Sequence, residues 1–181
     1  MLNEKTQMAI EELTAVIPPP ASPVATGTPE GWKPIEEWLG VELPPDFREY
    51  TAVYGAGMLA GWIGLYNPFT ETAWGLQENV KSEVDTIHIL EEDIELEMPH
   101  PIWPEQPGML PCGHDAGGGL LLYHTEGRPE EWPVYYTQPR DYQSYECFEM
   151  PITTFLAKLC QGEIPGRGQG SRELMFEPFD K

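Results

Sequence analysis

The chain has 181 residues, 40% of them hydrophobic, which is enough for one sizeable core and predicts one main domain. Ten Lys and Arg residues stand against 30 Asp and Glu residues, and the formal net charge is -20 at pH 7. Nucleic acids and anionic membranes bind cationic surfaces, so this charge argues against both as partners. It is compatible with a basic protein partner, or with a role in solubility alone.

The first 31 residues are predicted to form a helix and a proline-rich linker. Ile10, Leu13 and Ile17 recur on one face of residues 4–17, and three prolines in succession end the helix. Residues 21–31 are either a linker or an extended strap, and their composition leaves open whether they pack on the domain.

The beginning of the chain and the cysteines predict a cytoplasmic protein. Residues 1–5 lack the basic and apolar stretches of a signal peptide. Cys112, Cys147 and Cys160 are odd in number and widely spaced, which favours reduced thiols over a disulfide framework.

The main domain is predicted to span residues 32–163 and to begin with two short helices, over 35–39 and 45–54, each preceded by proline and followed by glycine. Residues 58–66 are apolar and end at an Asn-Pro pair, which favours one buried strand. Apolar residues then recur every three or four positions and predict an amphipathic helix from residue 76 towards residue 97, although a short strand near its end is also compatible with the sequence. The apolar positions are Leu76, Val80, Val84, Ile87, Leu90 and Ile94.

Residues 108–136 predict a β-meander. Gly117, Gly118 and Gly119 suit a tight turn between strands at 110–112 and 120–124, because glycine adopts positive φ without a steric clash. The polar segment that follows contains Gly and Pro and marks a second turn before the next strand. A last strand at 142–150, a helix at 151–161 and a C-terminal extension at 164–181 are expected after the meander.

Four segments, in this order and at this spacing, resemble the motifs of a known family. They are residues 35–55 (IEEWLGVELPPDFREYTAVYG), 108–123 (GMLPCGHDAGGGLLLY), 129–134 (PEEWPV) and 152–159 (ITTFLAKL). The family is the SMI1/KNR4 (SUKH) superfamily, and the resemblance covers about residues 32 to 163.

The resemblance implies a mixed α/β (α+β) fold, with a mostly antiparallel sheet and helices packed on it, and it implies no catalysis. Many bacterial members are immunity proteins that bind and block a cognate secreted toxin, often a nuclease, and others act as regulatory binding modules. Two positions depart from the family pattern. Gly119 stands where many members have an Asp after paired glycines, and Cys112 stands where an aromatic residue often follows Leu-Pro, so contacts of that Asp do not carry over.

Cys112, His114, Asp115 and His124 are the candidate metal ligands or catalytic groups. Cys112 and His114 lie two positions apart, a step that places two side chains on one face of a strand. A zinc site usually shows closely paired Cys or His ligands, however, and no nucleophile signature surrounds the cysteine. We therefore predict no catalytic residue, no metal and no cofactor, but a buried thiol and a turn in which His114 and Asp115 bond backbone groups. The alternative is a small metal-assisted or thiol hydrolase that uses these four residues.

The aromatic and acidic residues predict a protein interface, because Trp and Tyr are enriched among interface anchors and acidic side chains steer a cationic partner. The expected partner-binding residues are Glu91, Glu92, Asp93, Trp103, Tyr135, Tyr142 and Tyr145. A second interpretation places Trp132 and Tyr136 in the core and only Tyr135 outside. We predict an immunity protein that binds and neutralises a cationic, nuclease-like toxin, with an intracellular regulatory module as the alternative.

Overall fold

The computed structural model describes residues 4–138, 141–165 and 173–179, and the side chains of all of these except residues 138, 141 and 142. The helices are α1 (Glu4–Val16), α2 (Pro29–Leu39), α3 (Pro45–Tyr54), α4 (Leu76–Ile94) and α5 (Ile152–Gln161), with a short 3-10 helix, η1 (Pro129–Glu131). The strands are β1 (Gly57–Leu59), β2 (Ile63–Leu65), β3 (Met109–Asp115), β4 (Leu120–His124), β5 (Val134–Gln138), β6 (Asp141–Phe148) and β7 (Phe176–Pro178).

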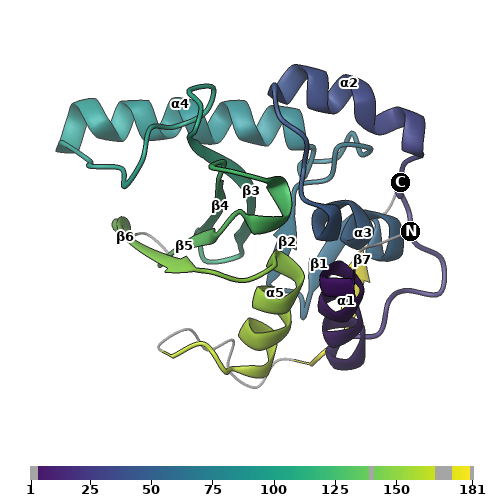
Figure 1. Cartoon of the computed structure of the whole chain (residues 1–181). Coiled ribbons are helices and arrows are strands. Elements are labelled where there is room, and N and C mark those ends of the chain that lie inside the picture. Colours follow the sequence, from purple (N-terminus) through teal and green to yellow (C-terminus); the bar gives the residue numbers. More distant parts are fainter. Residues whose placement is uncertain (1–3, 139–140, 166–172, 180–181) are drawn as a thin grey trace.

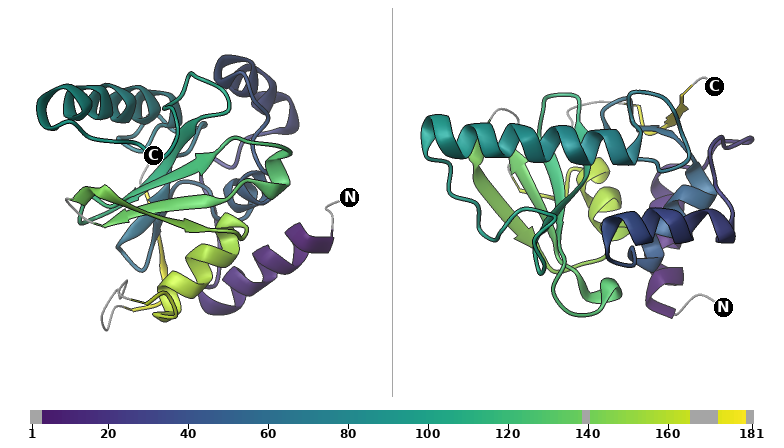
Figure 2. Two further views of the ribbon diagram at one scale, coloured as in Figure 1. Left: turned by 60° about the vertical axis from the view of Figure 1, so that its left-hand side comes forward. Right: turned by 90° about the horizontal axis from the view of Figure 1, so that it is seen from above.

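The strands form one antiparallel sheet in the order β6-β5-β4-β3-β2-β1-β7. Helices α1, α3 and α5 pack together on one face of the sheet, and α4 crosses the other face (Figure 1, Figure 2). This arrangement confirms the mixed α/β fold with an antiparallel sheet.

The N-terminal helix belongs to the same core as the sheet. Ile10, Leu13 and Ile17 are buried in the cluster that also contains the sheet residues. The hydroxyl of Tyr54 in α3 donates a hydrogen bond of 2.5 Å to the carbonyl oxygen of Ile17. The helix expected from the apolar periodicity is therefore present, and its apolar face is covered by α3 and α5.

The helix expected over residues 35–39 begins earlier, at Pro29. Thr28 is its N-cap, because the Thr28 hydroxyl accepts a hydrogen bond of 3.2 Å from the backbone N–H of Gly31. Pro29 fits the first turn, where a backbone N–H has no helical acceptor. Pro34, which was expected to open the helix, lies inside it.

The single strand predicted over residues 58–66 is instead the hairpin β1–β2. Ala60 and Gly61 both have positive φ, of 53° and 57°. The N–H of Trp62 donates to the carbonyl oxygen of Leu59 at 3.0 Å and closes a tight turn. Positive φ at both central residues fits the twist of a hairpin, and the alanine there conceals the turn from sequence reasoning.

The predicted meander is confirmed as β3, β4 and β5. Gly118 has a φ of 90° in the turn between β3 and β4. Leu121 pairs with Tyr136, and Leu122 pairs with Tyr135, so neighbouring residues of β4 face opposite helix layers. The register of β3 against β4 shifts beside Cys112, which marks a β-bulge.

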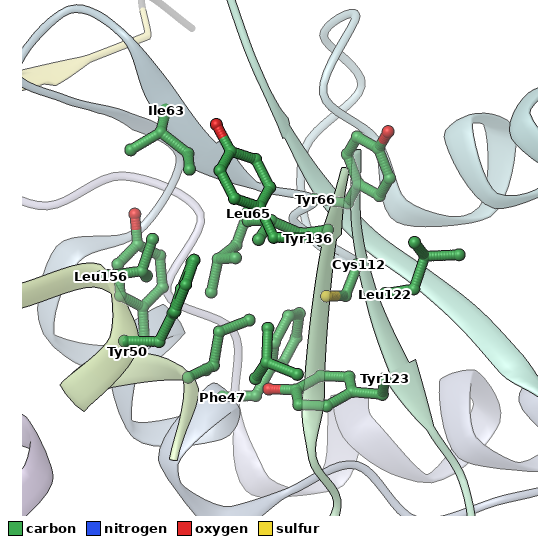
Figure 3. Close-up of a cluster of buried hydrophobic side chains, with 14 of the residues drawn as sticks. Phe47, Tyr50, Ile63, Leu65, Tyr66, Cys112, Leu122, Tyr123, Tyr136 and Leu156 are labelled. Atoms are coloured by element: carbon green, nitrogen blue, oxygen red, sulfur yellow. The ribbon is translucent and has the colours of Figure 1, made fainter. Parts of the chain in front are cut away.

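The two sheet faces carry separate apolar contacts. Figure 3 shows Phe47 and Tyr50 of α3 and Leu156 of α5 on the same side as Tyr123, while Leu122 points to the other side. On that other side, α4 buries Leu76, Val80, Val84 and Ile87 and runs unbroken to Ile94, so no strand forms near its end. Within the described residues, no helix has the length and apolar character that a membrane crossing requires.

The end of the chain returns to the sheet. Strand β7 pairs with β1 and buries Phe176, and the ring of Phe179 stacks on Trp74 with a centroid distance of 5.3 Å. Part of the predicted C-terminal extension is thus an edge strand.

Candidate functional site

Cys112 lies in the core. Its side chain is 1% exposed, on the face that α3 and α5 cover, where it interacts with Asp46 and Tyr123. Burial raises the pKa of the Cys112 thiol well above its usual range, and the Asp46 carboxylate raises it further. Such a thiol is a poor nucleophile and a poor metal ligand, because both roles require the thiolate.

His114 lies on the opposite face of the sheet, beside α4. Its ring stacks on Trp74 with centroids 4.0 Å apart, and its Nδ1 is 3.1 Å from the hydroxyl oxygen of Tyr66. The Tyr66 hydroxyl also donates to Glu83 Oε1 at 3.3 Å. Burial lowers the pKa of His114, although Asp115 acts in the opposite direction. The prediction that the His114 side chain bonds backbone groups of the turn is wrong, since its partner is a tyrosine.

Asp115 holds the turn after β3, as predicted. Its Oδ1 accepts hydrogen bonds from the backbone N–H groups of Gly117, at 2.6 Å, and Gly119, at 3.0 Å. Its other oxygen accepts the hydroxyl hydrogen of Tyr136. A Cβ at position 119 would lie 2.5 Å from Asp115 Oδ2, so the Asp115 carboxylate occupies the space that a longer side chain at 119 would need.

His124 lies away from Cys112, because it follows Tyr123 in β4 and faces the other side of the sheet. Its ring stacks on His100 with a centroid distance of 3.7 Å, and His100 Nε2 is 3.1 Å from the hydroxyl oxygen of Tyr135. Burial, followed by the neighbouring His100, lowers the pKa of His124. In the described part of the chain, no three His, Cys, Asp or Glu side chains converge as a metal site would require.

The predicted aromatic anchors have separate structural contacts. The indole N–H of Trp103 donates to the carbonyl oxygen of Leu39 at 2.9 Å, and its ring lies 4.9 Å from that of Trp38, so Trp103 ties the loop before β3 to α2. Tyr145 is half-buried and packs against the core cluster. Tyr142 lies in β6, but its side chain falls outside the described residues.

Tyr135 differs from its neighbours in β5. It is half-buried beside His100, whereas Trp132 and Tyr136 are buried in the core. The second interpretation is therefore confirmed for Trp132 and Tyr136, whereas Tyr135 packs partly against the core and does not lie wholly outside it.

The predicted acidic residues lie at the C-terminal end of α4. Glu91 lies 2.9 Å from His88 Nδ1, while Glu92 and Asp93 are exposed. Figures 1 and 2 show this end of α4 on the same side of the molecule as β6. Their role in binding stays a prediction.

A cavity of about 490 Å³ opens elsewhere, between α3, the start of α2, η1 and the segment before α2. We call residues 24–28 the strap and this cavity the strap cavity. Its lining includes Trp32, Glu42, Arg48, Glu49 and Glu130. A second cavity of about 460 Å³ lies next to it, with Trp32, Glu42 and Arg48 in both linings and further residues of α2 in its own. We call the two adjacent cavities together the groove.

The strap is the middle of segment 21–31, whose packing its composition left open, and it is fixed to the domain. The carbonyl oxygen of Val24 accepts the N–H of Ala56 at 2.9 Å, and the carbonyl oxygen of Ala25 accepts the side-chain N–H of Asn67 at 3.0 Å. Phe69 packs so closely against Gly27 that a Cβ there would clash with its ring. Contacts within the chain therefore hold this wall of the groove in place.

Comparison with known proteins agrees with this architecture. The sequence model of the SMI1 / KNR4 family (SUKH-1) matches residues 26–157, which is most of the chain. The chain belongs to the SMI1/KNR4 family. A search of curated proteins and a search of solved structures each found no match. The matched region starts within the strap and contains the groove, but excludes α1.

The SMI1/KNR4 motif at residues 35–55 contains a structural residue that sequence reasoning missed. Asp46, at the start of α3, is 6% exposed, and its Oδ2 accepts hydrogen bonds from Thr153 N, at 3.2 Å, and Thr153 Oγ1, at 3.4 Å. It thus caps α5, whose own N-cap is Pro151. Asp46 belongs to the LPPD sequence of this motif, but its capping role could not be predicted because Thr153 lies 107 positions away.

Proposed function

We propose that this chain is a non-enzymatic protein-binding module, and specifically an immunity protein that binds and neutralises a cognate, cationic, nuclease-like toxin. The family match over residues 26–157 carries the proposal, because SMI1/KNR4 members are generally binding modules without catalytic activity. The net charge of -20 supports a cationic partner. We also propose a cytoplasmic location, with which the three free thiols agree.

The separation of the candidate catalytic groups speaks against the hydrolase alternative. Cys112 is buried on one face of the sheet, while His114 and His124 face the other and are held by different aromatic partners. A nucleophile and its base must lie within hydrogen-bond reach, so these residues offer no such pair in this arrangement.

Co-expression with the protein encoded beside this chain tests the proposal. We expect the wild-type chain to form a stable complex with that protein and to relieve the growth arrest that it causes. Binding without relief of growth arrest would favour the regulatory module. The absence of both binding and relief would refute the proposed pairing.

The role of charge is tested by stopped-flow kinetics on the same complex. Raising salt from about 50 to 500 mM shortens the Debye length from roughly 14 to 4 Å and should slow association about tenfold, with little change in dissociation. The triple variant Glu91→Gln, Glu92→Gln, Asp93→Asn should reproduce the effect if the end of α4 faces the partner. An association rate that is indifferent to salt would leave the acidic surface as a solubility trait.

A further inference from the structure

We propose that the strap cavity receives a basic side chain, Arg or Lys, from an extended segment of the protein partner. The proposal rests on the proposed protein-binding function and adds the location and chemistry of one contact. It follows from three properties of the cavity: fixed walls, an apolar aromatic lining and carboxylates that have no cation of their own.

The aromatic lining comes from Trp32 of α2. Its ring lies edge-on to Phe69, with centroids 4.9 Å apart, and edge-on to Phe47 at 6.3 Å, so its orientation is fixed from both sides. The guanidinium of Arg48 lies 5.7 Å from the Trp32 ring centroid, so one cation of the chain itself already contacts this indole. Prolines 29, 45 and 129 complete an apolar lining that suits the aliphatic stem of a long basic side chain.

The charges of the cavity are unbalanced. Three carboxylates, those of Glu42, Glu49 and Glu130, line it, and Arg48 is the one cation among its lining residues in the described part of the chain. Arg48 is already bound by Glu36 of α2, in an ion pair and hydrogen bond. Among the described residues, neither Glu42 nor Glu49 has an ion-pair partner, so two carboxylates lack a counter-charge.

Glu130 is the partly neutralised member of the three. Its Oε1 lies 3.4 Å from Arg128 Nη1, and that arginine is largely exposed and more closely bound to Glu131. An entering cation would therefore meet at least two uncompensated carboxylates. An anionic ligand would be repelled by them, and a purely apolar segment would bury them without a partner, which is unfavourable.

The length of the groove selects a segment over a small cation. The second cavity shares Trp32 and Arg48 with the strap cavity and is also lined by Lys33, Glu37, Gly40 and Val41. The two cavities are about 490 and 460 Å³, so each is as large as a typical site for a small organic ligand. An extended chain can place one basic side chain in the strap cavity and lay its neighbouring residues along α2.

Two matched pairs of variants test this contact. Ala52 is exposed on α3 and lines the strap cavity, so Ala52→Arg fills the cavity and supplies its own cation. Ala15→Arg makes the same change on the exposed face of α1, outside the groove. Glu42→Gln with Glu49→Gln removes the two unpaired charges, and Glu78→Gln with Asp85→Asn removes two charges from exposed positions of α4.

The first probe is the peptide acetyl-Pro-Leu-Arg-Pro-amide, titrated into the 15N-labelled full chain and followed by NMR. We expect saturable shifts at the amides of Thr28, Glu42, Glu49 and Ala52, and binding at least tenfold weaker for the analogue with neutral citrulline in place of arginine. The double glutamine variant should bind roughly three- to tenfold more weakly, the effect expected for two partly exposed ion pairs. Ala52→Arg should bind more than tenfold more weakly, and both control variants should bind like wild type.

Three results of the titration would overturn the proposal. They are equal binding of the citrulline peptide, unchanged binding to Ala52→Arg, and no saturable shift up to about 10 mM peptide, a concentration that detects affinities in the millimolar range. Shifts centred on the end of α4 would also overturn it, because they would reflect general attraction to acidic surface.

The complex with the co-expressed partner separates this proposal from the proposed function. If wild type binds the partner and Ala52→Arg binds it equally well, the groove proposal fails and the binding function stands. If wild type binds no partner but binds the arginine peptide with the expected variant pattern, the partner assignment fails and the groove proposal stands. Loss of partner binding in Ala52→Arg but not in Ala15→Arg supports both.

Discussion

Replacing Asp46 should destabilise the protein by uncoupling α3 from α5. The Asp46 carboxylate accepts two hydrogen bonds from Thr153. Because Thr153 is fully buried, water cannot take the place of the carboxylate as acceptor. In Asp46→Ala the first turn of α5 loses its cap, which costs about 1 kcal/mol of stability. The substitution also leaves buried donors of Thr153 unpaired, which costs about 1 to 3 kcal/mol. Relief from burying a carboxyl group offsets part of this, and we expect a net loss of about 2 to 3 kcal/mol in the free energy of unfolding.

Asp46→Asn separates hydrogen bonding from charge. The amide oxygen can still accept from Thr153, so this variant should lose less stability than Asp46→Ala. Burial raises the pKa of Asp46 above 3.8, against the hydrogen bonds of Thr153 and Ile152. The folded state therefore binds the proton more tightly than the unfolded state, and the associated stability is present below pH 3.8 and is lost as pH rises through the folded pKa. Since Asn does not titrate, Asp46→Asn should gain stability relative to wild type between pH 4 and pH 7.

Urea unfolding of wild type and both variants at several pH values measures these differences. Asp85→Ala, on the exposed face of α4, serves as the control and should change stability by less than about 0.5 kcal/mol. Equal losses in Asp46→Ala and Asp46→Asn would contradict the capping role. A relative loss for Asp46→Asn as pH rises would mean that attraction to the α5 N-terminus outweighs the burial of charge.

Three further predictions concern the sheet. Leu122→Ala should lower the free energy of unfolding in urea by about 2 to 5 kcal/mol, because Leu122 is fully buried in β4, and an effect near zero would contradict its place in the core. Gly118→Ala should lower the free energy of unfolding by at least about 1 kcal/mol, because alanine disfavours positive φ. Gly119→Ala should lower it more, because the new Cβ would displace the Asp115 carboxylate. Thermal melts in which both variants match wild type would refute the turn geometry. Because the pKa of His124 is lowered in the folded state, its contribution to stability is present above pH 6.5 and declines as pH falls through the folded pKa. The stability difference between wild type and His124→Gln should therefore shrink from pH 7 to pH 5. A constant difference would exclude this titration.

Local sequence patterns predicted the elements that local physics determines. The 3.6-residue apolar period predicted α1 and α4, and the glycines between β3 and β4 predicted the turn where Gly118 has positive φ. The motif resemblance then supplied what periodicity could not, namely that the strands form one antiparallel sheet.

The errors arose where a distant contact or an atypical residue decides the structure. Ala60 takes a positive φ that its side chain disfavours, so the turn between β1 and β2 had no glycine at that position to reveal it. The strap is held by hydrogen bonds from Ala56 and Asn67, and Asp46 accepts hydrogen bonds from Thr153. These contacts join residues that are far apart in the sequence, so no local pattern reveals them. The candidate groove was missed for the same reason, since residues between 26 and 52 line it together with the distant Pro129 and Glu130.

The excess of acidic residues has two separable consequences for binding. The whole charge of -20 acts at a distance, raises the rate of encounter with any cationic protein and is screened by salt. In the contact that we propose, the carboxylates of Glu42 and Glu49 act at short range, beside a fixed apolar wall, where geometry discriminates between partners. Charge elsewhere on the surface cannot substitute for them, because it offers no cavity for the aliphatic stem of a basic side chain. Added salt should therefore slow the association of many cationic proteins alike. Ala52→Arg should instead raise the dissociation rate, and only for the cognate complex.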